Sequence, residues 1–456
     1  MSVLSRYYFV FLISYFLFAS MRSIFGDSER KTPKGQRIVT ALFVVFAFII
    51  LAFDQNMLSF DIETFVFGTF TLAFAIAGPV ITNKFYKRAC PNITNAMFFL
   101  LSLGFVALVR LNADLAARQL LFAALGFGVS KLIPLVLRIF RSFEKLEKLY
   151  ILLCLGLVGI VTIVDFLAAL TGIPLVAVDE FGATRWLSIA GFTFQSSEFV
   201  KPIFVVYLAC AFRTKPSMGK LVFAGLSSAA LIGILVLQRD LGSALMFFTI
   251  FMVMLYATTG SKALGLAGLG AMAAASVAAY QIFPHLRVRV AAWADPWAVI
   301  DGQGFQVAQS LFAIGTWGPF GIGLNRGWSN GIPVVERDVI FSAIAEEFGW
   351  LFALLLIFIF GIILLRGTDI ARRSKRPLYA LMALGFSVFL AFQAFVSIGG
   401  NIKLIPMTGI TLPFLSYGGS SVFVSILMVG MLNWLNGEIN VEEAEVSDEL
   451  SNSDEV

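Results

Sequence analysis

The sequence predicts an all-α polytopic membrane protein with about thirteen transmembrane helices, its N-terminus outside and its C-terminus cytoplasmic. Three observations lead to this fold class. The 456 residues have a mean hydropathy of +0.89 and only 13% of them are charged, against about 25% in an ordinary soluble domain. Apolar runs of about 17–23 residues recur along the chain, which is the length that a helix needs to cross a bilayer. Basic residues collect in every second connection between these runs.

The apolar runs define the expected helices in chain order. Each run carries few charges, and most are bounded by basic or proline- and glycine-containing segments. The expected spans are 4–21, 38–53, 66–82, 96–110, 117–137, 149–171, 199–213, 221–238, 242–259, 263–283, 341–365, 377–397 and 420–436.

Charge in the connections gives the orientation. Lysine and arginine follow every odd-numbered span from the first to the eleventh, for example Arg30, Lys31 and Lys34 after the first and Arg372 and Arg373 after the eleventh. Positive charge in short loops marks the cytoplasmic side. The large loops 172–198, 284–340 and 398–419 are therefore expected outside.

The remaining composition excludes several function classes. The net charge of +5 comes mostly from short loops, so no soluble basic domain is present to bind nucleic acid. Cys90, Cys154 and Cys210 have no metal or disulfide spacing and are expected to be packing residues. The acidic tail 437–456 is expected to be disordered in the cytoplasm.

The segment 399–421, reading GGNIKLIPMTGITLPFLSYGGSS, cannot continue a membrane helix. It contains two prolines, Pro406 and Pro413, and five glycines, yet it is too apolar for a solvated loop. Irregular backbone at membrane depth is tolerated where it is buried in protein or lines a cavity. We therefore expect this segment to form the wall of a site.

Charged residues at the start of the span 199–213 indicate a polar site. Glu198 and Lys201 are three residues apart and share a helix face, and Arg185 precedes them in the run GATRW. Charges within membrane spans are usually functional. The alternative is an ion pair that only anchors the helix.

The outer loop 284–340 combines cations, acids and tryptophans. Arg287 and Arg289 suit phosphate groups, and Asp295 and Asp301 follow closely. The alternative is that this loop merely caps the helix bundle. The single histidine, His285, is expected to be interfacial rather than catalytic.

Three further clusters complete the pattern. Arg239 and Asp240 form either a functional couple or a structural turn. Glu346 and the adjacent Glu347 enter an apolar run, where they must face polar groups. Asn401, Lys403 and Ser416 belong to the broken segment 399–421.

In this order, the clusters resemble the shape, elongation, division and sporulation (SEDS) family, to which RodA and FtsW belong. The resemblance covers roughly residues 150–436 and rests on LPFLSYGGSS (412–421), GATRW…FQSSE..K (182–201) and GFQ..QSLFAIG (304–315). It implies a ten-helix SEDS-like core, about 91–436, in the bacterial cell membrane. About three N-terminal accessory helices within 1–90 would then precede that core.

The resemblance also implies an activity. Family members are peptidoglycan glycosyltransferases that polymerise lipid II into glycan strands during cell elongation, division or sporulation. They work among membrane lipids, usually with a class B penicillin-binding protein as partner. A carboxylate takes the proton from the acceptor hydroxyl, and cations stabilise the departing pyrophosphate, either alone or with a divalent cation such as Mg or Mn. The implied base is Asp301, with Asp295 in reserve; the implied substrate-binding residues are Arg185, Glu198, Lys201, Arg287, Arg289, Glu347, Lys403 and Ser416. Among these, Glu198 and Glu347 would orient the cations.

Three departures from the family pattern keep other functions open. Gln195-Ser196-Ser197-Glu198 lacks the family's proline, and Arg337 begins a stretch that usually starts with threonine. The family's catalytic aspartate lies three residues after a proline, where an ungapped match from Pro296 places Val299. The alternatives are a flippase for the lipid-linked precursor and a non-catalytic SEDS-like scaffold.

Overall fold

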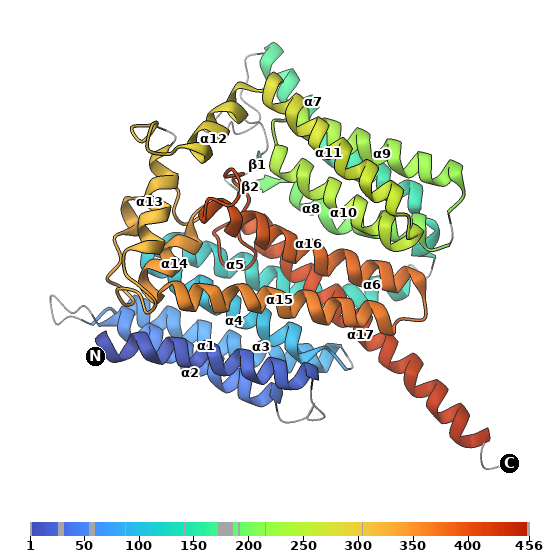
Figure 1. The fold of residues 1–456 in the computed structure, drawn as a ribbon. Helices are drawn as coiled ribbons and strands as arrows, with labels where there is room; N and C mark the ends of the chain where they lie inside the picture. The colour runs from blue at the N-terminus through green and yellow to red at the C-terminus, as the bar shows by residue number, and fades with distance from the viewer. Residues whose placement is uncertain are drawn as a thin grey trace. The chain divides into compact units, whose positions relative to one another are not determined.

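The computed structural model describes residues 2–25, 32–53, 60–86, 88–139, 142–171, 186–189, 192–214, 216–302 and 304–453. Helices dominate these residues, with one short antiparallel hairpin (Figure 1). The elements are α1 Ser2–Phe25, α2 Thr32–Ala52, α3 Ile62–Phe85, α4 Pro91–Leu111, α5 Ala113–Ser130, α6 Ile133–Ile139, α7 Glu147–Thr171, β1 Trp186–Ile189, β2 Phe192–Gln195, α8 Ser196–Phe212, α9 Met218–Leu237, α10 Leu241–Thr259, α11 Lys262–Ile282, α12 Pro284–Ala294, α13 Gly304–Gly315, α14 Ile340–Phe348, α15 Trp350–Arg373, α16 Pro377–Asn401 and α17 Gly419–Ser453.

Within the described residues, 12 helices are long and apolar enough to cross a membrane. The prediction of a polytopic all-α membrane protein is therefore confirmed. The predicted seventh span, 199–213, corresponds to α8, which has only 17 residues and is not among the twelve. The exact number of spans and their orientation stay predictions.

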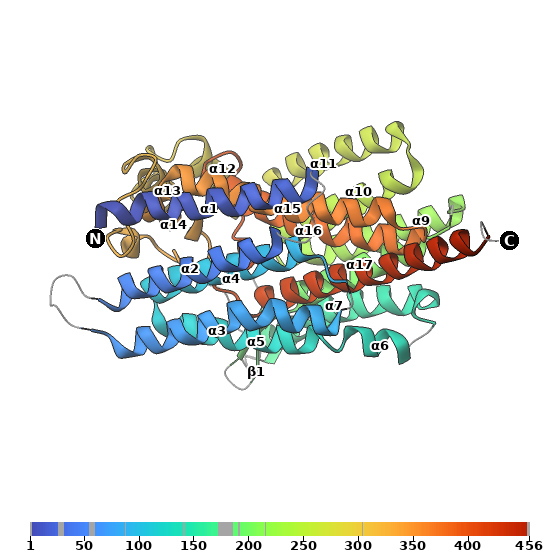
Figure 2. The ribbon, with the colours of Figure 1, turned by 90° about the horizontal axis from the view of Figure 1, so that it is seen from below.

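The chain packs into two compact units. The first comprises Met1–Ala124, Ala273–Arg366 and Leu390–Gly418, and the second Leu125–Met272, Gly367–Phe389 and Gly419–Val456. In the first unit, α4 packs against α2 and α3 and is almost entirely buried. Figure 2 shows α2, α3 and α4 side by side. In the second unit, α8 contacts α7, α9, α10 and α17.

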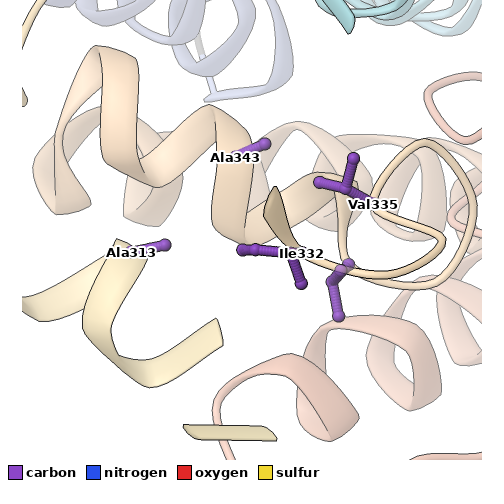
Figure 3. Close-up of a cluster of buried hydrophobic side chains, with 5 residues drawn as sticks. Ala313, Ile332, Val335 and Ala343 are labelled. Atoms are coloured by element: carbon purple, nitrogen blue, oxygen red, sulfur yellow. The ribbon is translucent and has the colours of Figure 1, made fainter. Parts of the chain in front are cut away.

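A small apolar cluster holds the outer loop together in the first unit (Figure 3). It joins α13, the irregular stretch before α14, and α14 itself. Its buried members are Ala313, Ile332, Val335, Val339 and Ala343, with Leu111 and Met407 packed against them. Buried apolar area of this kind gives an irregular loop a defined position.

The predicted span 341–365 is wrong, because the structure divides it at Gly349. The backbone there has a φ of +92°, and a Cβ atom would lie 2.1 Å from the Pro319 carbonyl oxygen. Only glycine tolerates that conformation and approach. The helix α14 therefore ends before the apolar span α15, and the two glutamates lie outside that span.

In the structure α17 continues through most of the acidic tail to Ser453, and the disorder expected of 437–456 stays a prediction. The tail follows a long membrane helix directly, so no new helix nucleus is needed. The run Glu442-Glu443-Ala444-Glu445 consists of residues that favour helix propagation.

Candidate functional site

The end of α14 holds the outer loop through both backbone and side chains. The amides of Ile322 and Gly323 donate to the carbonyl oxygens of Glu346 and Glu347, each at 2.9 Å. The Glu346 carboxylate accepts from the Trp328 amide at 3.0 Å and also from the Ser329 hydroxyl. These bonds answer the expectation that the adjacent glutamates face polar groups.

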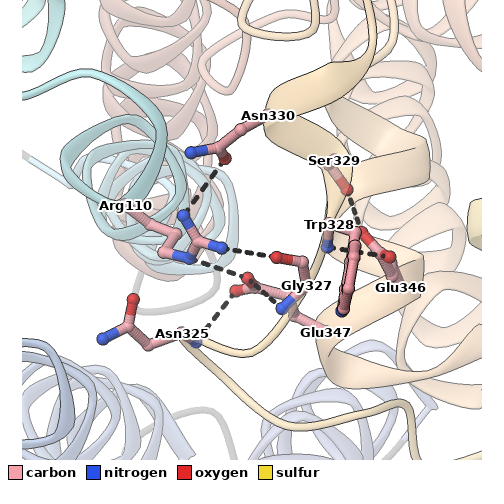
Figure 4. A network of polar contacts seen from close by, with 8 residues as sticks. All are labelled: Arg110, Asn325, Gly327, Trp328, Ser329, Asn330, Glu346 and Glu347. Carbon is pink, nitrogen blue, oxygen red and sulfur yellow. Dashed lines mark hydrogen bonds and ion pairs between the residues drawn. The ribbon is translucent and has the colours of Figure 1, made fainter. Parts of the chain in front are cut away.

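Glu347 is the centre of the same network (Figure 4). Its carboxylate accepts from the amides of Gly327 at 3.1 Å and Asn325 at 3.3 Å. Arg110, in the last turn of α4, donates to it from Nε at 3.0 Å. The same guanidinium donates to the Gly327 carbonyl at 2.7 Å and to Asn330 Oδ1 at 3.1 Å. One arginine therefore fastens α14 and the loop to α4.

Burial changes the acidity of this carboxyl. It raises the pKa of Glu347 to about 7, and the charge of Arg110 opposes that rise. We expected Glu347 to orient the candidate pyrophosphate cations. Its partner is instead Arg110, which was not among them.

The helix α12 is attached to residues 402–418, which are the part of the broken segment 399–421 that lies between α16 and α17. Arg289 donates to the carbonyl oxygens of Thr408 at 3.0 Å and Met407 at 3.4 Å. The indole of Trp293 donates to the Lys403 carbonyl at 3.1 Å. Arg289 and Lys403 are thus brought into one region, while Arg287 is exposed on the same helix.

A half-buried acid lies at this junction. A Cβ atom on Gly409 would be 3.6 Å from an Asp338 carboxylate oxygen and 3.9 Å from an Arg289 guanidinium nitrogen. Asn401 donates to the Asp338 carbonyl at 2.8 Å and accepts from Ser342 at 2.9 Å. The start of the broken segment is therefore bonded to the stretch that leads into α14.

The two candidate bases lie in the turn between α12 and α13. Asp295 is exposed, but its Oδ1 accepts from the amides of Trp297 at 3.1 Å and Ala298 at 3.3 Å. It therefore closes the turn. Asp301 is exposed farther along the same turn, and Val299 is 38% exposed between them.

The turn from Pro296 to Gly304 is tightly closed. The Val299 carbonyl accepts from the amides of Gly302 at 3.1 Å and Gly304 at 3.0 Å. A Cβ atom on Gly304 would meet the Pro296 oxygen at 2.2 Å. The loop is thus compact here, with Val299 and Asp301 two residues apart at its surface.

Ser416 has a structural environment. Its hydroxyl donates to the Arg337 carbonyl at 2.5 Å and accepts from the Leu412 amide at 2.8 Å. Gln119 of α5 donates to the Ser416 carbonyl at 2.9 Å and accepts from the Gly418 amide at 3.1 Å. The predicted interruption of the helix is therefore present between α16 and α17, and the Gln119 side chain pairs two of its backbone groups. That this segment forms the wall of a site stays a prediction.

The second unit holds a separate polar cluster. Lys201 Nζ lies 2.6 Å from Glu198 Oε1, and both side chains are buried. Close by in this unit, Asp240 accepts from Ser197 Oγ at 3.3 Å and caps α10 through the Ser243 amide at 3.2 Å. Glu198 and Lys201 form the ion pair that the sequence analysis gave as the alternative to a functional site, and Asp240 makes the structural turn that the sequence left open.

The sequence-predicted residues therefore fall into separate groups. The first unit contains Arg287, Arg289, Asp295, Asp301, Glu347, Lys403 and Ser416, whereas the second contains Glu198 and Lys201. Arg185 lies outside the described residues.

Sequence reasoning missed Arg110 and Gln119. Each is a polar residue in or at the end of an expected span, at 96–110 and 117–137. The rule that singled out Glu198 would have found them, because buried polar groups in spans need partners.

The described part of the chain contains no group of three or more His, Cys, Asp or Glu side chains that could hold a metal ion. Mg²⁺ commonly binds through one or two carboxylates together with substrate phosphates. A divalent cation therefore has no assigned ligands among the described residues.

The family of FtsW, RodA and SpoVE, described as cell cycle protein, matches residues 88–440. The peptidoglycan glycosyltransferase RodA of Mycobacterium tuberculosis is 35% identical over 283 residues, which cover 59% of this chain and 60% of that protein. Stage V sporulation protein E of Bacillus subtilis is 33% identical over 279 residues, covering 59% of this chain and 75% of that protein.

The chain thus spans about 60% of the length of the mycobacterial relatives that it matches. Among solved structures, a chain of a peptidoglycan synthase complex that coordinates polymerization and crosslinking is 26% identical, with a TM-score of 0.63, and the match covers 78% of this chain and 99% of that one. The rod shape determining protein RodA of Thermus thermophilus is 24% identical, with a TM-score of 0.55. The match covers 77% of this chain and 97% of that chain, and it shows a shared fold.

Proposed function

Because the chain belongs to the FtsW, RodA and SpoVE family, the SEDS family, we propose that it is a peptidoglycan glycosyltransferase. It would polymerise lipid II in the bacterial cell membrane during elongation, division or sporulation. The family match over residues 88–440, which includes every candidate motif, is the observation that carries the proposal. The names of the relatives support it.

The proposed chemistry uses the outer loop. The acceptor sugar hydroxyl attacks the anomeric carbon of the donor, Asp301 accepts the hydroxyl proton, and the pyrophosphate leaves. Asp301 is exposed, so we expect bound substrate to provide its burial. Arg287 and Lys403 would contact the pyrophosphate from α12 and from the broken segment.

Two of the predicted residues receive a different role. Arg289 donates to two backbone carbonyls, so it holds α12 against the broken segment and adds positive charge there. Lys201 is buried and paired with Glu198, which assigns it to positioning α8 rather than to direct contact with pyrophosphate.

A class B penicillin-binding protein is the proposed partner. A synthase complex that coordinates polymerization and crosslinking contains a structurally similar chain. Membrane lipids would contact the exposed faces of the apolar helices.

One observation favours a different function. Val299 occupies the position where the resemblance expects the catalytic aspartate, and it lies in an exposed, closed turn. A valine cannot accept a proton, so a precursor flippase or a non-catalytic scaffold is the second candidate.

Polymerisation of labelled lipid II by the purified chain tests the proposal, with and without a class B penicillin-binding protein. The variants are Asp301→Asn, Asp295→Asn and, as a matched exposed acid at the start of α5, Asp114→Asn. Glycan products are expected from wild type and Asp114→Asn, with a loss of at least about 100-fold in Asp301→Asn. Asp295→Asn should lose little, because an amide oxygen can still accept the two turn amides.

Several results would redirect the proposal. Full activity of Asp301→Asn would remove the base role from this residue. No glycan product under any condition, together with movement of labelled lipid across liposomes, would favour the flippase. A gain of polymerisation in Val299→Asp alone would indicate that the natural chain is a scaffold.

A further inference from the structure

The helices α1 to α3 precede the segment that matches the family, which begins at residue 88. We propose that α1 and α2 are positioning elements of the site: they support α14, and α14 in turn holds the outer loop that carries Asp301. This inference deepens the proposed function and rests on it for the catalytic consequence. The structural part stands on contacts within the first unit alone.

Aromatic side chains join the two N-terminal helices to α14. The rings of Phe9 and Phe348 have centroids 5.1 Å apart, and those of Phe43 and Phe348 are 6.1 Å apart. Phe9 also meets Phe43 at 5.3 Å, and Phe348 stacks on Phe352 at 4.8 Å. Edge and offset contacts at these distances add to the apolar burial of each ring.

These aromatic contacts are made at the end of α14 that forms the hydrogen bonds to the outer loop. Phe348 directly follows Glu346 and Glu347, whose carbonyls and carboxylates accept the amides of five loop residues. Those residues are Ile322, Gly323, Asn325, Gly327 and Trp328. A displacement of Phe348 would therefore move both glutamates and the bonds that they make.

A second contact reaches the loop directly from α1. The centroid of the Tyr7 ring lies 4.6 Å from that of Phe320, in the part of the outer loop between α13 and α14. The first helix thus touches the loop as well as the helix that holds it.

Polar bonds attach the other end of the N-terminal helices to the core. Arg366 of α15 donates to the Ser23 carbonyl at 2.6 Å. Gln36 donates to Ser20 at 2.8 Å, and Asn95 of α4 donates to Gln36 at 2.8 Å. Phe9 and Ser23 are separated by about 21 Å along an α-helix, so α1 is attached near both of its ends. Two separated attachments oppose rocking of the helix better than one.

Hydrogen–deuterium exchange of the detergent-purified full chain tests this support. Phe9→Ala and Phe43→Ala remove rings that are 2% and 0% exposed, whereas Phe11→Ala makes the same change at a ring that is 64% exposed on the same helix. We expect amides of 322–328 to exchange at least about tenfold faster in the first two variants and at the wild-type rate in Phe11→Ala. Exchange across α9, in the other unit, should not change.

One further variant and one further assay distinguish a positioning role of these rings from a general loss of folding. Phe9→Leu refills most of the space and should restore slow exchange at 322–328. Lipid II polymerisation is measured on the same samples, and its rate should follow exchange at these amides.

Unchanged exchange at 322–328 in both Phe9→Ala and Phe43→Ala would overturn the inference, as would an equal rise across α9. The exchange readout needs no catalysis. Faster loop exchange in variants of a chain that makes no glycan would therefore uphold the support and refute only the proposed function.

Discussion

Replacing Arg110 with methionine tests the network that joins α4, α14 and the outer loop. The Arg110 and Glu347 side chains are only 13% and 9% exposed and lie 3.0 Å apart. Removing one partner of a buried ion pair typically costs about 3–5 kcal/mol, because it leaves the other charge uncompensated. We expect a loss of that size in the free energy of unfolding, since two further bonds from the guanidinium are lost as well.

The loss in the free energy of unfolding caused by Arg110→Met should depend on pH. Burial raises the pKa of Glu347 to about 7 in the folded chain, above its ordinary value of 4.5. A raised pKa means that the folded chain holds this proton more tightly, so its stabilisation is present below about pH 4.5 and is lost as the pH rises through about 7. Without Arg110 to oppose the rise, the pKa of Glu347 increases further. Arg110→Met should therefore cost more at about pH 8 than at about pH 5.

Equilibrium unfolding in detergent measures these differences by linear extrapolation. The set contains wild type, Arg110→Met, E347Q and the double variant. A coupling of about 2 kcal/mol between the two sites is expected for charges in direct contact. A cost for Arg110→Met below about 0.5 kcal/mol, or the same cost at both pH values, would refute the reasoning.

Two further predictions concern close packing and buried polar groups. Gly349→Ala should destabilise the chain by more than about 1 kcal/mol, because this position has a φ of +92° and a backbone oxygen would lie 2.1 Å from the new Cβ. The control is Gly361→Ala, in a helical position with open space around it, which should be neutral or stabilising by up to about 1 kcal/mol. Equal melting temperatures for both would contradict the argument from the turn. Gln119→Leu should cost about 2–4 kcal/mol, because it leaves the buried carbonyl of Ser416 and the amide of Gly418 unpaired. Faster hydrogen exchange at Gly418 is the expected signature, and unchanged exchange there would assign the broken segment's order to other contacts.

Hydropathy and charge determined much of this protein directly. A run of twenty apolar residues has few folded alternatives to a membrane helix, because lipid leaves backbone groups no other partner. The same logic located the break within 399–421, where Pro406 and Pro413 exclude a helix; the structure narrows it to 402–418. The spacing of Glu198 and Lys201 made their pairing one of two expectations, since residues three apart share a helix face.

The tertiary structure decided the partners of residues far apart in the chain. Arg110 and Glu347 are separated by 237 positions, and no local pattern distinguishes that pairing from the expected one with the outer-loop cations. The end of α14 depends likewise on Pro319 approaching Gly349, which a continuous apolar run does not reveal. Helix formation is a local property of the chain, whereas burial and the pairing of charges are set by whichever distant segments fold against them.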